Sequence, residues 1–395
     1  MKRVGFILCS LFLLTGCWDK REIKTLGFVM AIGIDKDSKS GNILLTAQVV
    51  DPEAVQGETS LAKSSVKLVI NKGKTVFQAI RKMLQEFDRK NHYAHNKVIV
   101  IGEDLAKEGL LPILDSLKRG GDIRGYVWLC IAKGAKARDV LGVKQEGLEK
   151  IQANYLKGII ANQKFNYSSA NLTILEFYKK VLGTGIYPVA SSFQIIQKNN
   201  YPVEENSKKK TDYIKLSGGA VFRKDKLVGY LNETETHGYN WVVGKVKSGI
   251  IVLPSLIEKG KSASIEVIKS SAKIKPVLKE NKIYFTIDIH EKAVIVEEQG
   301  RGQFKSSEER FQYFKKMEKE NEKLVRKEVI KAVNKAKKLS SDFLGFGNAL
   351  NKQYPTKWNE MKKKWDKQFS DIRVIVKVDV TIRGSREMKG PFKAQ

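Results

Sequence analysis

Residues 97–132 read KVIVIGEDLAKEGLLPILDSLKRGGDIRGYVWLCIA. The apolar run Lys97–Ile101 predicts a short strand, the apolar positions of Leu105–Leu117 recur at helical spacing, and Gly125–Ala132 predicts a second strand. Alternation of strand and helix is typical of a layered α/β architecture. This stretch therefore predicts a sheet packed against helices.

The residues on the N-terminal side continue the alternation. Leu26–Asp35 and Ile43–Asp51 predict a hairpin-like pair of strands around a polar turn, and Ser65–Asn71 predicts another strand. Two helical stretches are predicted within Gly147–Lys180. A helix that buries one face is predicted from apolar residues at helical spacing, namely Val76, Phe77, Ile80, Met83, Leu84 and Phe87.

The sequence changes character at Lys198–Asp212, which has few apolar residues and a run of charge and predicts a linker. Beyond it, paired strands are predicted at Ile214–Phe222 and Lys226–Leu231, and a helix at Glu233–Lys247. Further strands with alternating apolar residues are predicted at Ile250–Leu253, Ser264–Val277 and Ile283–Ile295.

The C-terminal residues predict helices and a last strand. Ser307–Leu339 predicts a long helix with apolar residues on one side and lysines elsewhere. Tyr354–Phe369 predicts a second helix, and Ile372–Ile382 predicts a final strand. The fold class that follows is mixed α/β (α+β), with β-sheets packed against helices.

The composition fits a globular protein with an excess of positive charge. The 395 residues are 42% hydrophobic and include 8 prolines, so the chain has enough apolar side chains for a core and is neither disordered nor fibrous. The formal net charge of +29 at pH 7 favours anionic surroundings such as lipid headgroups, wall polymers or nucleic acid. A solvated, lysine-rich surface explains the same charge equally well.

The N-terminal residues predict export and lipidation. Lys2 and Arg3 form a cationic start, and Val4–Leu14 is an apolar run that falls short of the roughly 20 residues needed to span a bilayer. The segment Leu14-Thr15-Gly16-Cys17 has the form of a lipobox, with small residues before the cysteine. Residues 1–16 are therefore expected to be a lipoprotein signal peptide, and the Cys17 thiol the acceptor of a diacylglyceryl anchor.

Cysteine usage leaves no internal disulfide in the mature chain. Cys9 leaves with the signal peptide, Cys17 is predicted to carry lipid, and only Cys130 remains. Because Cys130 lies in the apolar run Tyr126–Ile131, it is predicted to be a small core residue of a strand. Export and the lack of a nucleic-acid-binding signature argue against nucleic acid as a partner.

No local pattern predicts catalysis, a metal site or a cofactor. His92 and His95 lack a third ligand. Glu233 and Glu235 are the best local pair of carboxylates, but acids at the start of a helix are better explained by capping and the helix dipole. Gly183-Thr184-Gly185 lacks the third glycine of a dinucleotide-binding loop. The chain is therefore predicted not to be an enzyme.

Several segments together resemble one family. Gly16-Cys17-Trp18-Asp19-Lys20-Arg21-Glu22-Ile23, continuing to Gly33-Ile34-Asp35, resembles the mature start of the Ger(x)C family of spore-germination lipoproteins. Further similar segments extend the resemblance over nearly the whole mature chain, namely His95–Gly102, Leu175–Lys180, Gly218–Phe222, Leu227–Leu231, Glu235, Phe346-Gly347, Tyr354-Pro355, Trp358 and Trp365.

The resemblance implies the lipid-anchored C subunit of a nutrient germinant receptor, needed for receptor assembly or signalling during spore germination. It implies A and B membrane subunits as partners, and a place on the extracytoplasmic face of the spore inner membrane. The resemblance implies no cofactor and no catalytic residue, and Cys17 is the only residue to which it assigns a role.

Two other classes of protein stay open from the residues alone. An extracytoplasmic solute-binding lipoprotein would capture a nutrient directly, and a cleft between two similar α/β lobes would favour it. An envelope hydrolase would require an acid or nucleophile with a perturbed pKa in a cleft.

The chain is predicted to have several domains. After the signal peptide at 1–16, an N-terminal α/β region covers 17–197, a linker covers 198–212, and a β-rich α+β domain covers 213–395. The family resemblance implies that the N-terminal region holds one or two subdomains, with a division near 134–146.

Overall fold

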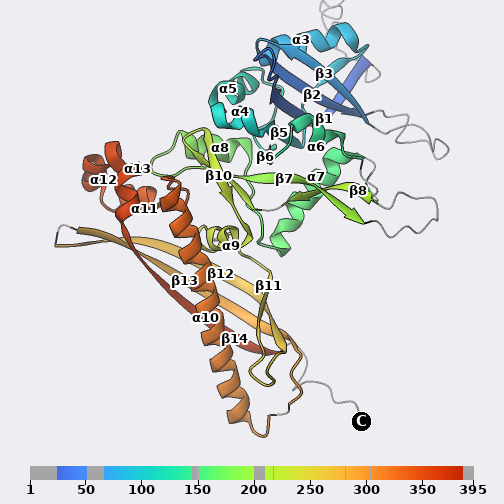
Figure 1. Ribbon diagram of the computed structural model, residues 1–395. Coiled ribbons are helices and arrows are strands. Elements are labelled where there is room, and N and C mark those ends of the chain that lie inside the picture. The colour runs from blue at the N-terminus through green and yellow to red at the C-terminus, as the bar shows by residue number, and fades with distance from the viewer. Residues whose placement is uncertain are drawn as a thin grey trace, which may run out of the picture.

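The computed structural model describes residues 25–50, 66–144, 149, 151–199, 210–216, 218–280, 282–302 and 304–385. Within these residues the strands form two sheets, one of ten strands and one of four. Figure 1 shows two units, in which the larger sheet and its helices lie at one end and the smaller sheet with one long helix lies at the other. The predicted mixed α/β fold, with sheets packed against helices, is confirmed.

The larger sheet is parallel at its centre and antiparallel at its edges. Its strands are β1 (Leu26–Lys36), β2 (Ile43–Val50), β3 (Val66–Gly73), β4 (Lys90–His92), β5 (Val98–Gly102), β6 (Trp128–Ala132), β7 (Val189–Asn199), β8 (Lys210–Leu216), β9 (Gly219–Arg223) and β10 (Lys226–Leu231). The order is β10-β9-β7-β6-β5-β1-β2-β3, with β4 beside β1 and β8 beside β7. The neighbours β1, β5, β6 and β7 run parallel.

Helices cover both faces of this sheet, which explains why its central strands are apolar along their whole length. Every residue of β5 is buried. One face carries α3 (Val76–Glu86), α4 (Glu103–Glu108), α5 (Leu111–Arg119) and α8 (Ile174–Val181). The other carries α6 (Ala137–Gly142) and α7 (Gln152–Asn162), which continues into the short 3-10 helix η2 (Gln163–Phe165).

The helix predicted at Leu105–Leu117 is two helices, α4 and α5. Gly109 has a φ of 126°, a backbone conformation that favours glycine and ends α4. Pro112 then lies in the first turn of α5, where its missing N–H has no helical partner to lose. The sequence pattern combined the two because their apolar residues face the same sheet.

The smaller sheet packs against one long helix. Its strands are β11 (Ile250–Pro254), β12 (Ser262–Lys279), β13 (Lys282–Glu298) and β14 (Arg373–Ser385), in that order, with β13 and β14 parallel. The helix α10 (Ser307–Lys338) covers the residues predicted to be a long helix, and the Ser306 hydroxyl caps it by accepting from the N–H of Glu309 at 3.0 Å. The shorter α9 (Glu233–Val242) packs against α10.

Strands on both sides of the predicted linker belong to the same sheet. β7 runs to Asn199 and β8 begins at Lys210, and the two pair antiparallel, whereas residues 200–209 lie outside the described residues. β9 and β10 also pair within the larger sheet, so the smaller sheet begins at β11.

The helix predicted at Tyr354–Phe369 is interrupted. It consists of α12 (Pro355–Met361), η3 (Lys362–Lys364), α13 (Trp365–Gln368) and η4 (Phe369–Asp371), and α11 (Phe346–Gln353) precedes it. The backbone leaves the helical region at Lys364, with φ of −114° and ψ of 11°. Trp358 and Trp365, which lie on either side of this break, are both buried in the core.

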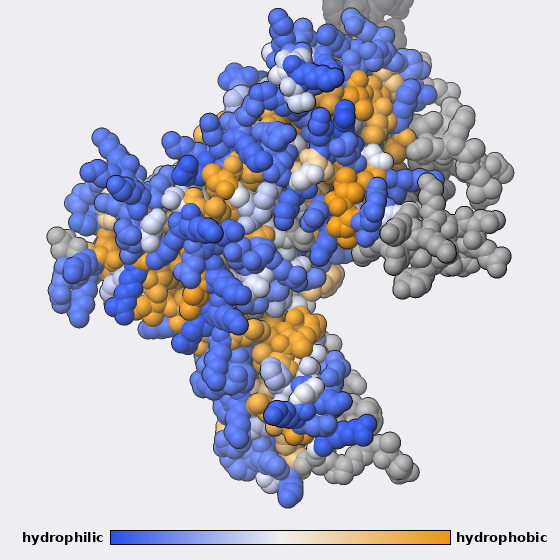
Figure 2. Space-filling model, viewed as in Figure 1, coloured by the Kyte–Doolittle hydropathy of each residue, from blue (hydrophilic) through white to orange (hydrophobic). Residues whose placement is uncertain are grey.

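The surface reflects the excess of lysine. Figure 2 shows hydrophilic residues over most of the visible face of both units, interrupted by apolar patches. None of the helices in the described parts of the chain is long and apolar enough to cross a membrane.

Candidate functional site

The two units meet where the segment after α8 contacts the segment before α11. Asn348 donates its N–H to the carbonyl oxygen of Gly185 at 2.9 Å, and Tyr187 donates its N–H to the carbonyl oxygen of Asp342 at 2.9 Å. Figure 1 shows α11, α12 and α13 beside α8 and β10. We call this contact region the junction.

Glycines allow the backbones to approach at the junction. Gly185 has a φ of 66°, and a Cβ on it would lie 2.4 Å from the carbonyl carbon of Gly347. A Cβ on Gly183 would lie 2.3 Å from the carbonyl oxygen of Lys179 in α8. The segment Gly183-Thr184-Gly185 therefore serves close contact between backbones.

The carboxylate of Asp342 organises the turn that begins α11. Its Oδ1 accepts from the N–H groups of Gly345 at 2.8 Å and Phe346 at 3.0 Å. Its Oδ2 accepts from the N–H of Gly347 at 2.7 Å and from the indole N–H of Trp365 at 3.0 Å. Burial raises the pKa of Asp342 to about 6, and the four donors act in the opposite direction.

Aromatic side chains pack around this carboxylate. The rings of Trp358 and Trp365 lie 5.2 Å apart at 68°, and the rings of Phe346 and Phe369 lie 5.6 Å apart. Phe285 of β13 contacts Phe346 edge to face at 5.0 Å. Three segments that carry the family resemblance, Phe346-Gly347, Trp358 and Trp365, are therefore brought together here.

A cleft of about 800 Å³ opens beside the junction. Its two carboxylates are engaged within the fold, because Asp225 accepts from the N–H of Leu111 at 3.1 Å and Asp366 accepts from the hydroxyl of Tyr187 at 2.9 Å. Its other charged lining residues are cationic, namely Lys224, Lys362, Lys363, Lys364 and Lys367. This arrangement suits binding of an anionic group more than bond-making chemistry.

The carboxylates singled out from the sequence have a structural role. Asn232 caps α9 by accepting from the N–H of Glu235 at 2.9 Å, and Glu235 accepts from the N–H of Asn232 at 2.9 Å. Lys335 of α10 lies 3.4 Å from Glu235. The interpretation of Glu233 and Glu235 as acids at a capped helix start is confirmed.

His92 and His95 lie close together, with ring centroids 5.6 Å apart and Phe28 against both. His92 ends β4, and His95 lies in the loop before β5. Burial lowers the pKa of His95. No group of three His, Cys, Asp or Glu that could hold a metal ion occurs within the residues that the structure describes.

The two cysteine predictions have different outcomes. Cys130 is fully buried in β6, and burial raises the pKa of its thiol, so its interpretation as a core residue is confirmed. Cys17 lies outside the described residues.

A buried polar network between α9 and α10 was not predicted. Glu328 of α10 lies 2.9 Å from the Nδ1 of His237 and accepts from the indole N–H of Trp241 at 2.9 Å. On the next turns of α10, Asn321 donates its amide to Glu291 of β13 at 2.9 Å. The available signal was that Asn321 and Glu328 interrupt the apolar stripe of α10 at helical spacing.

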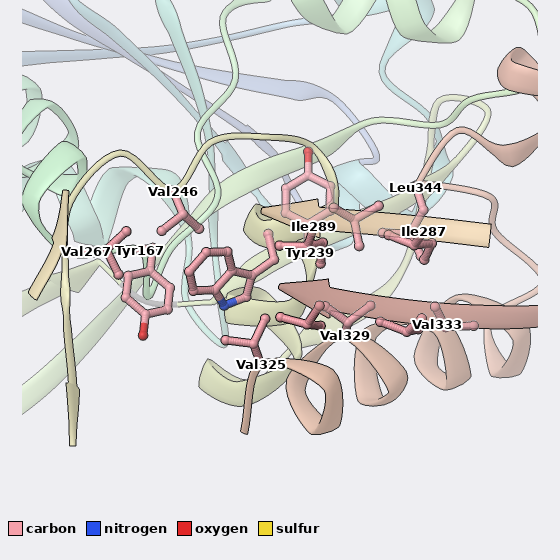
Figure 3. Packing of buried hydrophobic residues seen from close by; sticks show 14 of the residues in the cluster. Tyr167, Tyr239, Val246, Val267, Ile287, Ile289, Val325, Val329, Val333 and Leu344 are labelled. Atoms are coloured by element: carbon pink, nitrogen blue, oxygen red, sulfur yellow. The ribbon is translucent and has the colours of Figure 1, made fainter. Parts of the chain in front are cut away.

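The apolar side chains of that stripe surround the network. Figure 3 shows Val325, Val329 and Val333 of α10 pointing toward Ile287 and Ile289 of β13. All five belong to one buried cluster that extends from the junction through the smaller sheet.

We expect Glu291 to make the protein less stable as the pH rises. Burial raises the pKa of Glu291 from 4.5 to about 7, so between these values the folded state binds more protons than the unfolded state. The free energy of unfolding should therefore fall from pH 4.5 to 7, by up to about 3 kcal/mol. Glu291→Gln keeps an acceptor for Asn321 and should remove this part of the pH dependence.

Urea denaturation of the wild type and Glu291→Gln at pH 4.5, 6 and 7.5 measures the effect. An unchanged slope in the variant would show that Glu291 is already ionised across this range in the folded protein.

Comparison with known proteins matches the chain in two segments. Residues 19–195 match the family described as Spore germination protein N-terminal domain, and residues 217–386 match Spore germination B3/GerAC like, C-terminal. The chain belongs to the Ger(x)C family. The predicted resemblance to this family is confirmed.

Ger(x)C relatives of Bacillus subtilis (strain 168) align end to end with this chain. Spore germination protein KC is 28% identical, over 98% of this chain and 97% of its own length. Spore germination protein B3 is 27% identical, over 91% of each. The crystal structure of the GerBC protein matches with a TM-score of 0.55 and 21% identity, over 89% of this chain and 96% of that one, which shows the shared fold.

Proposed function

We propose that this chain is the lipid-anchored C subunit of a nutrient germinant receptor, needed for receptor assembly or signalling during spore germination. The observation that carries the proposal is the match of both family segments, over 19–195 and 217–386, to spore-germination proteins. The relatives named KC and B3 are covered over nearly their whole length. A and B membrane subunits are the proposed partners.

The proposed location is the extracytoplasmic face of the spore inner membrane, with a lipid on Cys17. The lipobox that ends at Cys17 supports this location. We also propose 198–212 as the division between the two family segments, because it lies in the interval between the matches. The division between the two sheets comes later in the chain, before β11.

A subunit role suits the chemistry of the described residues better than the other classes. The cleft beside the junction is lined by lysines, and its two carboxylates are hydrogen bonded within the fold, which leaves no free carboxylate there for an envelope hydrolase among its described lining residues. The two sheets differ in size and strand order, whereas a solute-binding lipoprotein would be favoured by two similar lobes. The proposed subunit is not an enzyme.

Deletion of the gene tests this function. Germination triggered by nutrients of the cognate receptor should be lost or slowed, whereas germination by stimuli that bypass receptors should be unchanged. Optical density and dipicolinate release measure both, with complementation by wild type and by Glu233 and Glu235 variants. A normal nutrient response in a strain without redundant receptors would contradict the proposal, and an equal defect under all triggers would favour an envelope hydrolase.

We expect Cys17→Ala to abolish lipidation and release the protein from the membrane. The Cys17 thiol is the acceptor at the lipobox, and lipid chains provide most of the membrane affinity. Metabolic lipid labelling and fractionation after a salt wash measure the loss. A variant that keeps both label and membrane association would contradict the lipobox assignment.

A further inference from the structure

A groove lies beside the first described strand. Leu26 and Gly27 of β1 pair in parallel with Lys90 and Asn91 of β4, so these residues lie one strand spacing apart, about 5 Å. Lys90 and Asn91 also line a cavity of about 210 Å³ between α3 and α5. The groove is therefore next to the point where the chain enters the larger sheet.

The walls of the groove are apolar and partly exposed. Phe77, Ile80 and Leu84 form a stripe along α3, with Phe77 40% and Leu84 43% exposed. Leu117 of α5 and Ile123 after it form the opposite wall. Large side chains exposed on one stripe of a helix are typical of a docking surface.

The base and rim of the groove are polar. Asn91 is buried at its base, and its Oδ1 has no hydrogen-bond partner among the described residues. Arg81 and Lys90 line the rim, together with one carboxylate, Asp122. Apolar side chains with two cations and one carboxylate beside them match the interfacial region of a membrane with anionic headgroups.

Chain length limits how far this face can be from the membrane. Under the proposed function the lipid is on Cys17, and the nine residue-to-residue steps from Cys17 to Leu26 reach at most about 32 Å. Because Leu26 pairs with Lys90, the groove lies beside the point where this tether joins the larger sheet, and it is within the tether's reach of the bilayer.

We propose that the anchor-proximal face, formed by α3, β4 and the end of α5, lies against an anionic phospholipid bilayer. Phe77 and Leu84 enter the interfacial region, and Arg81 and Lys90 contact phosphate groups. This proposal rests on the proposed lipidation of Cys17 and adds an orientation, in which the smaller sheet and α10 are held away from the lipid.

A single spin label tests the orientation in the mature, lipidated full chain. Cys130 is fully buried and Cys17 would carry the lipid, so an introduced cysteine is the one that reacts. Leu84→Cys places the label in the groove. Ile330→Cys on α10 is a matched control, because Ile330 is also 43% exposed on a helix and lies among Lys327 and Lys331.

The readout is collision of the label with oxygen, which concentrates in lipid, and with a water-soluble nickel complex. In vesicles containing phosphatidylglycerol, we expect position 84 to collide mainly with oxygen and position 330 mainly with nickel. Equal access to nickel at both positions, or a lipid-buried label at 330, would overturn the proposal. A label at 84 shielded from both reagents would also overturn it, because protein would then cover the groove.

A second comparison tests whether the cations Arg81 and Lys90 are needed for contact with the lipid. Arg81→Glu with Lys90→Glu should remove the excess of oxygen collisions at position 84, whereas Arg326→Glu with Lys327→Glu on α10 should leave it unchanged. Vesicles of phosphatidylcholine alone should show the same loss as the first pair. Unchanged collisions in all three cases would overturn the role of the cations.

Failure of the underlying lipidation is distinguishable from failure of the orientation. Mass spectrometry that finds a second label, on Cys17, would show that the anchor is absent. A lipidated chain with an exposed label at position 84 would instead reject the orientation alone.

Discussion

Asp342→Ala is expected to lower the free energy of unfolding by about 4 kcal/mol. The carboxylate accepts from three backbone N–H groups and from the indole of Trp365, and all of these groups are buried. Each buried donor left without an acceptor costs about 1–3 kcal/mol, and breaking a buried charged network costs about 3–5 kcal/mol. The turn that begins α11 should therefore lose its order, and the junction with it.

Chemical denaturation measures the loss for Asp342→Ala, and intrinsic tryptophan fluorescence, to which Trp358 and Trp365 at the junction contribute, gives a second readout. Asp342→Asn keeps one acceptor oxygen and should lose less stability than alanine. Asp371→Ala is a matched control, because Asp371 is exposed nearby in η4 and its loss should change stability by about 0.5 kcal/mol or less. Equal stability of the Asp342 and Asp371 alanine variants would contradict the assigned role.

Gly238→Ala should separate α9 from α10 at a cost of about 3 kcal/mol. A Cβ on Gly238 would lie 2.1 Å from the carbonyl oxygen of Glu328 and 2.6 Å from its carbonyl carbon. Both atoms belong to the backbone of α10, so the contact cannot be relieved by a side-chain rotation. His237 and Trp241, on either side of Gly238, would lose their contacts with Glu328.

Gly158→Ala in α7 is the matched control for Gly238→Ala. No atom lies within 4 Å of a Cβ at Gly158, so alanine there should stabilise the helix by about 0.5–1 kcal/mol. Thermal unfolding of both variants measures the difference. A wild-type melting temperature for Gly238→Ala would show that the two helices are not held in close contact.

Local sequence patterns predicted the strands and helices in which buried apolar residues recur at a regular spacing along the chain. In β13, Phe285, Ile287 and Ile289 alternate with polar residues because this face of the strand packs into the buried cluster that α10 and α11 complete. In α10 the apolar stripe and the Ser306 cap mark both the face and the start of the helix. Such signals come from residues near one another in sequence.

Local sequence patterns did not predict which strands pair when they lie far apart in the sequence. β9 and β10 follow the predicted linker, yet they pair with the larger sheet through β7. The interruption after Met361 was missed because lysines are good helix formers, so Lys362–Lys364 carry no local signal that the helix ends.

The candidate site was predicted only in part. Phe346 and Trp365 were singled out by resemblance, but Asp342, which accepts hydrogen bonds from both, was not. Asp342 accepts mostly from backbone groups, so no matching side chain in the sequence points to it. Its one local signal is its position just before a glycine and a helix, where an acidic side chain can bind free N–H groups.

The central claim is that this chain works as a subunit of a receptor complex, and purification from spore membranes tests it most directly. Full-length tagged protein would be extracted in mild detergent and captured, and its cognate A and B subunits would be identified by mass spectrometry. The account predicts that both A and B are recovered with the wild-type chain and are depleted when Asp342→Ala replaces it. Recovery of the intact chain without either subunit, from an extract that contains both, would contradict the account.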